Sequence, residues 1–259
     1  MDSREVLTRA AEPPDIVLRY ADHEDGLVDV FLPASLGRPG SPRPLLVLLH
    51  GGFWRQEYDR VQIRPLVNAL AQRGCVVAVP EYRRVGGSGG WPQTGDDVEA
   101  ALVATPALLA EVAPSWVDAG AAVMLWGHSA GGHLALWAGL RAGPRRVASI
   151  VTLAPVSDLA YAARAGMGDN AVQALLGGDP DDVPARYADA DTASLLPGAV
   201  PVTIIQGTAD KQVTVDMNRR LAARHSEIDY VELDGVEHFA LIDPLSEAFR
   251  TTVVAHLGC

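Results

Sequence analysis

Solid apolar runs recur along the chain, and none of them alternates with polar positions. They cover residues 44–50, 75–80, 121–126, 149–154 and 200–205. Runs of this kind are typical of strands that are buried on both faces of a parallel sheet. Segments with helical spacing lie among them, at residues 61–72, 96–112, 132–141 and 213–225. This alternation predicts an α/β protein with a mostly parallel, doubly wound sheet and helices on both faces.

Three regions depart from this alternation. Two short β-like runs, at residues 16–22 and 27–32, flank a polar turn and predict a hairpin at the edge of the sheet. Residues 157–197 are rich in Ala, Gly and Asp and contain no strong strand, so we expect a small helical, cap-like insertion over the sheet's C-terminal edge. Residues 1–14 are expected to form a flexible N-terminal tail. A length of 259 residues suits one domain spanning residues 1–259.

Charge and cysteine usage limit the environment and the partners. The net charge of -11, with no cluster of Lys and Arg, argues against binding to nucleic acid or to an anionic membrane surface. No apolar run reaches the roughly 18 residues of a membrane span. The N-terminus does not resemble a signal peptide, and Cys75 and Cys259 do not suggest a disulfide framework. We therefore expect a cytoplasmic protein that acts on a small, uncharged or modestly polar molecule.

The sequence GHSAGG at residues 127–132 follows a predicted strand and opens a predicted helix. In that context a GxSxG pattern predicts a nucleophile elbow, a sharp turn that holds its serine in a strained backbone conformation. Gly127 and Gly131 suit this turn because larger side chains would collide there. Ser129 is therefore the candidate nucleophile. The alternative interpretation is a Gly-rich turn with an incidental serine.

A serine hydroxyl needs a histidine to take its proton and a carboxylate to orient that histidine. His225 and His256 lie in helical patterns, where surface roles are favoured. His238 lies in the loop after a strand-like run at residues 230–233. A loop at that place presents the base in proteins with this elbow, so His238 is the candidate base, with a surface loop histidine as the alternative.

Asp210 is the candidate acid, because it lies on the loop that leaves the apolar run at 200–205, one strand before His238. Asp158, after the preceding strand, is the main competitor. The weaker competitors are Asp216 and Asp234. Asp210 could instead cap the turn before Val213. Both roles can hold together only if they use different carboxylate oxygens.

A tetrahedral intermediate also needs hydrogen-bond donors for its oxyanion. One donor is expected to be the backbone N–H of Ala130, directly after the nucleophile. Further donors are expected from the loop HGGFW at residues 50–54, where glycines let the backbone turn its N–H groups inward. His50 is then a structural residue of this loop rather than a base.

The loop at residues 50–54 resembles the HGGxW motif of the kynurenine formamidase (arylformamidase) group, in the esterase/lipase branch of the α/β-hydrolases. Residues 127–131 resemble the GxSxG motif of that group. The likeness extends through residues 19–21, 28–33, 81–84, 91–92 and 154–158. It implies an α/β-hydrolase fold, a triad of Ser129, Asp210 and His238, and no cofactor. It also implies oxyanion donors at Gly52, Phe53 and Ala130.

By this resemblance the best match is an arylformamidase that cleaves an N-formylkynurenine-like amide through an acyl-enzyme. A carboxylesterase and a feruloyl or acetyl esterase are alternatives within the same chemistry. A noncatalytic binding protein on the same fold is the alternative from another class. The partner is expected to be a small ester or amide, and the oligomeric state stays open, with a homodimer as one alternative.

Several other residues have more than one interpretation. Trp54, Tyr82 and Trp91 flank loops at strand ends, where they would either line an aromatic substrate pocket or pack in the core. Arg83 and Arg84 would bind a substrate carboxylate, face solvent or pair within loops, and the last two roles are favoured. No His/Cys/Asp cluster has metal-ligand spacing and no GxGxxG follows the first strand, so neither a metal nor a dinucleotide is expected.

Overall fold

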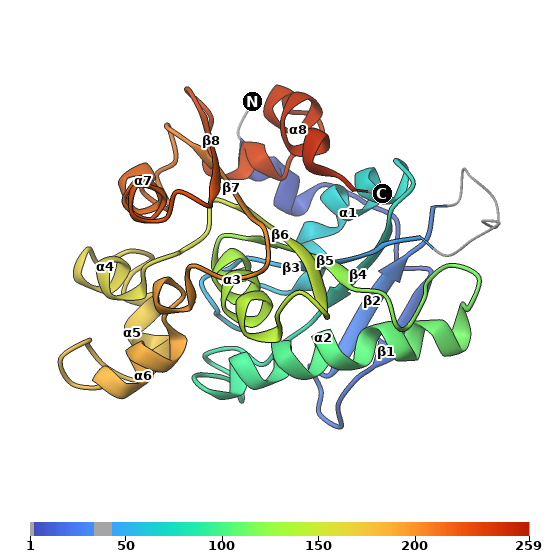
Figure 1. Cartoon of the computed structure of the whole chain (residues 1–259), viewed down its shortest axis with the longest axis horizontal. Helices are drawn as coiled ribbons and strands as arrows, with labels where there is room; N and C mark the ends of the chain where they lie inside the picture. The colour runs from blue at the N-terminus through green and yellow to red at the C-terminus, as the bar shows by residue number, and fades with distance from the viewer. Residues whose placement is uncertain (1–2, 34–42, 259) are drawn as a thin grey trace.

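The computed structural model describes residues 3–33 and 43–258, which form one eight-stranded sheet flanked by helices (Figure 1). The strands, in the order in which they lie side by side, are β1 (Ile16–Arg19), β2 (Leu27–Phe31), β4 (Val76–Pro80), β3 (Leu45–Leu49), β5 (Val123–His128), β6 (Val147–Leu153), β7 (Val202–Gly207) and β8 (Asp229–Leu233). The pairs β1–β2 and β2–β4 are antiparallel, and all other neighbours are parallel. The predicted parallel sheet and its edge hairpin are both confirmed.

The segments with helical spacing are helices. Those between the strands are η3 (Arg60–Ile63), α1 (Arg64–Ala71), α2 (Gln93–Val112), α3 (Ala130–Ala142) and α7 (Val215–Arg224). After β8 the chain forms η5 (His238–Leu241), α8 (Glu247–Thr251) and η6 (Val253–His256). Helix ends differ from the predicted ones by a few residues, because capping and packing set the ends more than apolar spacing does.

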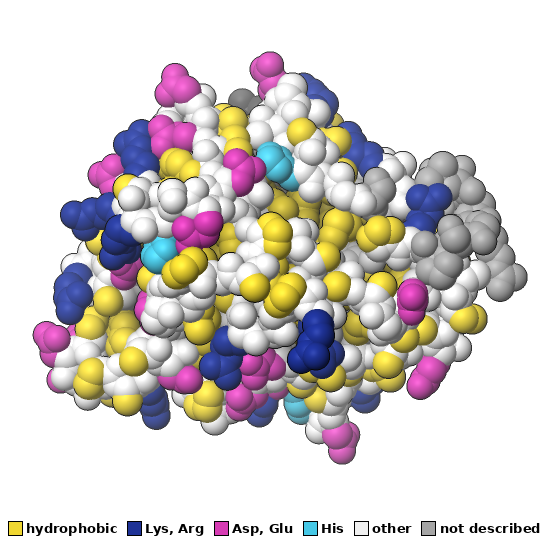
Figure 2. Space-filling model, in the orientation of Figure 1, with side chains coloured by type: hydrophobic (Ala, Val, Ile, Leu, Met, Phe, Trp, Pro, Cys, Tyr) yellow, Lys and Arg dark blue, Asp and Glu magenta, His cyan; other side chains and the backbone are white. Residues whose placement is uncertain are grey.

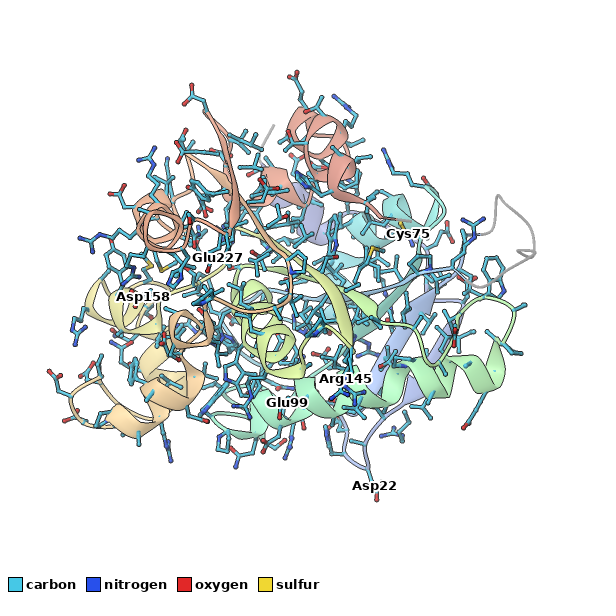
Figure 3. All side chains as sticks on the ribbon, in the orientation of Figure 1. Asp22, Cys75, Glu99, Arg145, Asp158 and Glu227 are labelled. Carbon is cyan, nitrogen blue, oxygen red and sulfur yellow. The ribbon has the colours of Figure 1, made fainter. Side chains whose placement is uncertain are left out.

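Two hydrophobic clusters cover the two faces of the sheet. Neighbouring residues of β3 illustrate the division, since Val47 packs with α2 and α3, whereas Leu46 packs with α1 and α8. Successive side chains of a strand point to opposite faces, so a strand that is apolar throughout must be covered twice. The non-alternating runs of the sequence arise from this double burial, and Figure 3 shows side chains filling the space on both sides of the sheet.

The region between β6 and β7 is the helical insertion that the sequence predicts. It contains α4 (Leu159–Arg164), α5 (Ala171–Leu176), α6 (Pro184–Ala190) and η4 (Ala193–Leu195). It packs against the segments that follow β3 and β4, because Arg55 donates to the carbonyl of Gly168 at 2.6 Å and the Trp91 indole donates to Asp189 at 2.7 Å.

The expected flexible tail is wrong for residues Ser3–Thr8, which form the 3₁₀ helix η1. Val6 is buried in the cluster that contains α1 and α8, and this burial holds the helix in place. Polar contacts to the far end of the chain add to it. The Ser3 hydroxyl donates to Glu237 at 2.9 Å, and Arg9 forms a two-pronged ion pair with Asp243.

Cys75 also differs from expectation. It is fully buried next to β4 and is disulfide-bonded, so the expectation that no disulfide forms is wrong; Cys259 lies outside the described residues.

Charged side chains of both signs are interspersed on the face of the molecule shown in Figure 2. Within residues 3–33 and 43–258, no helix has the length and apolar character needed to cross a bilayer.

Candidate active site

Ser129 stands at a sharp turn between β5 and α3, with φ 56° and ψ -118°. The neighbouring glycines make this turn possible. A Cβ on Gly127 would lie 2.1 Å from the carbonyl oxygen of Gly131, and a Cβ on Gly131 would lie 2.2 Å from that of Leu49. The strained serine and the small flanking residues are the geometry that the GxSxG pattern predicts.

We expect Gly131→Ala to lower the free energy of unfolding by about 3 kcal/mol, because its methyl group would collide with rigid backbone at the end of β3. Urea denaturation measures the change. Gly120→Ala is the matched control, since its Cβ would meet its nearest neighbour, Asp118, at an ordinary 3.4 Å. Equal unfolding midpoints for the two variants would contradict the packing argument.

The structure brings His238 and Asp210 together. His238 begins η5, and its Nδ1 lies 2.6 Å from Oδ2 of Asp210. Both side chains are buried, so the carboxylate keeps the proton of the imidazole on Nδ1 and leaves Nε2 able to accept one. The other carboxylate oxygen of Asp210 accepts from the N–H groups of Gln212 and Val213, each at 2.8 Å. Asp210 therefore caps the turn and orients His238 through different oxygens.

The competing residues have other partners. Asp158 caps α4 by accepting from the N–H of Tyr161 at 2.8 Å, and it lies at the start of that helix (Figure 3). His225 lies 3.4 Å from Glu227 at the end of α7. Neither of them lines the pocket that contains Ser129.

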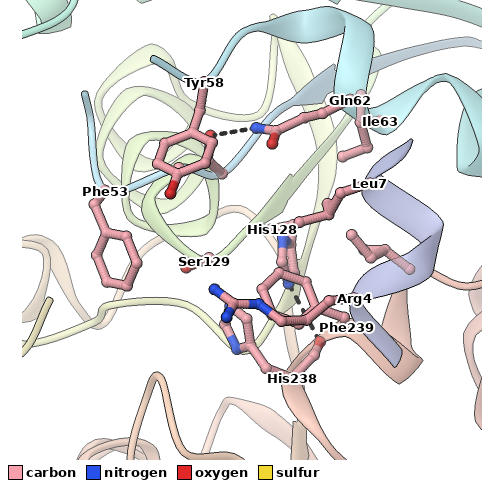
Figure 4. A pocket seen from close by; sticks show the side chains of 13 residues that line it. Arg4, Leu7, Phe53, Tyr58, Gln62, Ile63, His128, Ser129, His238 and Phe239 are labelled. Carbon is pink, nitrogen blue, oxygen red and sulfur yellow. Dashed lines mark hydrogen bonds between the residues drawn. The ribbon is translucent and has the colours of Figure 1, made fainter. Parts of the chain in front are cut away.

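Ser129 and His238 face the same pocket, which encloses about 450 Å³ including its open mouth (Figure 4). Its walls come from the elbow, the loop after β3, and the short helices η1, η3 and η5. The lining residues are Arg4, Leu7, Gly51, Gly52, Phe53, Tyr58, Gln62, Ile63, His128, Ser129, His238, Phe239 and Ile242. The apolar recess of this pocket is lined by Leu7, Ile63 and Ile242.

The loop after β3 has the backbone geometry of a donor loop. Gly52, Phe53 and Trp54 have φ values of 113°, 53° and 56°. Among the described residues, the N–H groups of Gly52, Phe53 and Ala130 have no hydrogen-bond acceptor in the protein. A Cβ on Gly52 would lie 2.3 Å from Cβ of Tyr58, so the turn leaves no room for a side chain there.

His50 supports this loop from below, as expected of a structural residue. Its ring is fully buried, lies 2.7 Å from Glu81 through Nε2, and stacks on Tyr82 with ring centroids 4.4 Å apart. The Tyr82 hydroxyl donates to the backbone carbonyl of His50 at 2.7 Å. The carboxylate of Glu81 in turn contacts Arg84, so a buried polar network underlies the loop.

The predicted aromatic pocket is wrong. Trp54, Tyr82 and Trp91 are buried and do not line the space around Ser129. Trp54 packs edge-on against His133 at 5.5 Å, and Trp91 packs against Trp137 at 4.8 Å. The rings of Trp54 and Trp91 fill the space between the insertion and α3. The sequence pattern did not predict that the insertion would pack there. Phe53, a candidate oxyanion donor through its backbone, is the aromatic residue of the HGGFW loop whose side chain lines the pocket.

The arginines at the end of β4 pair within the protein. Arg83 forms a two-pronged contact with Asp97, at 2.8 and 2.7 Å, and Arg84 donates to Asp25 at 2.9 Å. Of the three interpretations of these arginines, loop pairing is confirmed.

Sequence reasoning also missed His128, the variable position of the GxSxG motif. Its Nε2 lies 3.3 Å from the backbone carbonyl of His238, and the two rings are 4.4 Å apart. Burial and the neighbouring His238 lower the pKa of His128 well below its usual value, so the ring stays neutral and can donate to that carbonyl. In the sequence, only the place of His128 within the GxSxG motif pointed to a role near Ser129.

Among the described residues, no group of three or more His, Cys, Asp and Glu side chains is arranged to hold a metal ion. The groups described around Ser129 are a strained serine, a histidine that contacts a carboxylate, and backbone N–H groups without an acceptor in the described residues, and together they have the chemistry needed for acyl transfer.

Comparison with known proteins agrees with this geometry. Esterase LipC of Mycobacterium tuberculosis (strain ATCC 25618 / H37Rv) is 27% identical over 267 residues, covering 92% of this chain and 62% of that protein. The chain thus spans less than two thirds of the length of this relative.

Solved structures share the fold. Esterase B from Lactobacillus rhamnosis has a TM-score of 0.76 at 19% identity, covering 97% of this chain and 88% of its own. Esterase 2 from Thermogutta terrifontis, phosphonylated by sarin, has a TM-score of 0.72 at 20% identity, covering 94% and 93%. The sequence profile of the BD-FAE family matches residues 28–224, which is more than half of the chain. The protein therefore has the α/β-hydrolase fold and belongs to the BD-FAE family.

Proposed function

We propose that this protein is a serine esterase that cleaves small esters through an acyl-enzyme on Ser129. The observation that carries the proposal is the 2.6 Å contact between His238 and Asp210 in a pocket shared with the strained Ser129. The related proteins reported above are esterases, which favours an ester over the aryl formamide that the HGGxW resemblance implies.

In this mechanism the Ser129 hydroxyl oxygen attacks the ester carbonyl carbon while Nε2 of His238 takes its proton. The N–H groups of Gly52, Phe53 and Ala130 stabilise the oxyanion. His238 then gives the proton to the leaving alcohol as the ester C–O bond breaks. Water, deprotonated by His238, attacks the acyl-enzyme and releases the acid, which restores Ser129.

The pocket favours a short acyl group. The apolar side chains of Leu7, Ile63 and Ile242 line the pocket that contains Ser129. An apolar wall buries a small acyl chain favourably, and a pocket of about 450 Å³ including its open mouth suits a short chain better than a long one.

The test compares kcat/KM for p-nitrophenyl acetate, p-nitrophenyl palmitate and N-formylkynurenine. We expect the acetate to be cleaved at least about a hundredfold better than the palmitate. That factor corresponds to roughly 2.7 kcal/mol of discrimination, which steric exclusion can supply. Preference for the palmitate would overturn the short-acyl assignment. Formamide turnover within about tenfold of the acetate would restore the arylformamidase interpretation, and failure on all esters would overturn the esterase.

A further inference from the structure

A second groove adjoins the pocket of Ser129 and shares Arg4, His238 and Phe239 with it. The groove encloses about 430 Å³ including open space. Its remaining lining residues are Ser3, Ala209, Lys211, Gln212 and Glu237. His238 thus lines both the pocket that contains Ser129 and this charged groove.

We propose that this groove receives the leaving group of the ester and that Arg4 and Lys211 select an alcohol or phenol that carries a carboxylate. This inference rests on the esterase proposed above. His238 protonates the leaving oxygen, so the leaving group must lie against His238. The groove contacts His238 but not Ser129, and the pocket that contains Ser129 has the apolar wall of Leu7, Ile63 and Ile242, so we assign the acyl group to that pocket and the alcohol to the groove.

Arg4 lines both the pocket and the groove. Its guanidinium carbon lies 5.4 Å from the centre of the Phe239 ring, and that ring packs edge-on against His238 at 5.0 Å. Figure 4 shows the Arg4 side chain extending across Phe239 beside His238. The planar donors of a guanidinium are well suited to a carboxylate, and Arg4 presents them beside His238.

Lys211 contributes the second cation. It is the only lysine in the 259-residue sequence, and it follows directly after Asp210, the partner of His238. Glu237 is the opposing charge, and it accepts from the Ser3 hydroxyl at 2.9 Å. The groove therefore has two cations and one anion, in a chain whose net charge is -11. At physiological salt the Debye length is about 8 Å, so acidic side chains farther away than this repel a bound carboxylate only weakly. The two cations of the groove therefore dominate the electrostatic interaction with that carboxylate.

The experiment compares two acetate esters of nearly equal shape, 4-acetoxybenzoate and the neutral 4-acetoxybenzamide. We expect the ratio of their kcat/KM values, anionic over neutral, to be about five- to tenfold in the wild-type protein at roughly 0.15 M salt. Arg4→Gln and Lys211→Gln should each lower this ratio by about two- to fivefold, as measured for exposed charge pairs. Glu237→Gln should raise it, and added salt should lower it.

Arg219→Gln is the charge-matched control, because Arg219 is exposed on α7, pairs with Glu232 and does not line the groove. It should leave the ratio unchanged. A wild-type ratio of one or less, or an equal fall in Arg219→Gln, would overturn the inference while the neutral ester is still cleaved. Failure to cleave the neutral ester would instead count against the esterase itself.

Discussion

Ser129→Ala is expected to abolish ester cleavage and labelling by a fluorophosphonate probe, with kcat reduced by up to roughly a millionfold. The reason is that, in the proposed mechanism, the hydroxyl oxygen of Ser129 forms the acyl-enzyme. The fold should persist, since alanine removes a single atom at a site whose strain is set by Gly127 and Gly131. Residual turnover, circular dichroism and probe labelling measure the three outcomes.

Ser194→Ala is the control, because Ser194 is an exposed serine of the insertion. It should keep full activity and full labelling. Persistent labelling of the Ser129 variant would mean that another nucleophile carries the chemistry.

His238→Ala is expected to lower kcat/KM by on the order of a thousandfold or more, because the members of a triad act as a unit. Asp210→Asn should have a somewhat smaller effect, of about a hundredfold or more. Only the amide oxygen of the asparagine can accept from the N–H groups of Gln212 and Val213, so its NH₂ group must face Nδ1 of His238. The histidine would then carry its proton on Nε2, where it cannot act as a base.

Asp158→Asn provides the comparison for this prediction. Asp158 caps α4, and asparagine caps helices equally well, so activity should stay within a few fold of wild type. A larger loss for Asp158→Asn than for Asp210→Asn would show that the acid has been assigned to the wrong strand.

The parts of the fold that the sequence predicted are those that depend on local constraints. A strand that is buried on both faces must be apolar throughout, so β5 could be recognised from the sequence. A nucleophile elbow needs glycines where backbone segments approach closely, so Ser129 and Gly131 could be recognised as well. The proximity of His238 and Asp210 was predicted from the order of parallel strands, because the loops after neighbouring strands meet at one edge of the sheet. Only the structure shows that Asp210 contacts His238 through one carboxylate oxygen and caps the turn through the other.

The pocket walls could not be predicted in this way. Trp54 and Trp91 follow strands and were expected near Ser129, but the insertion and α3 cover them, and this covering depends on packing between distant segments. Leu7 and Ile242 line the pocket although neither belongs to a motif. Short 3₁₀ helices lack a strong periodic signal, so the residues that shape specificity were those with the weakest pattern.

The contact between η1 and η5 has a consequence for biosynthesis. Ser3 bonds to Glu237 and Arg9 to Asp243, so each contact closes a loop of 234 residues. As the chain leaves the ribosome, the elbow and its serine can form long before the histidine exists. Contacts of such long range form late, because loop closure must precede them. In the proposed mechanism, a nascent chain therefore holds the nucleophile Ser129 before its base His238 has been made, and the contacts between the two ends of the domain form last.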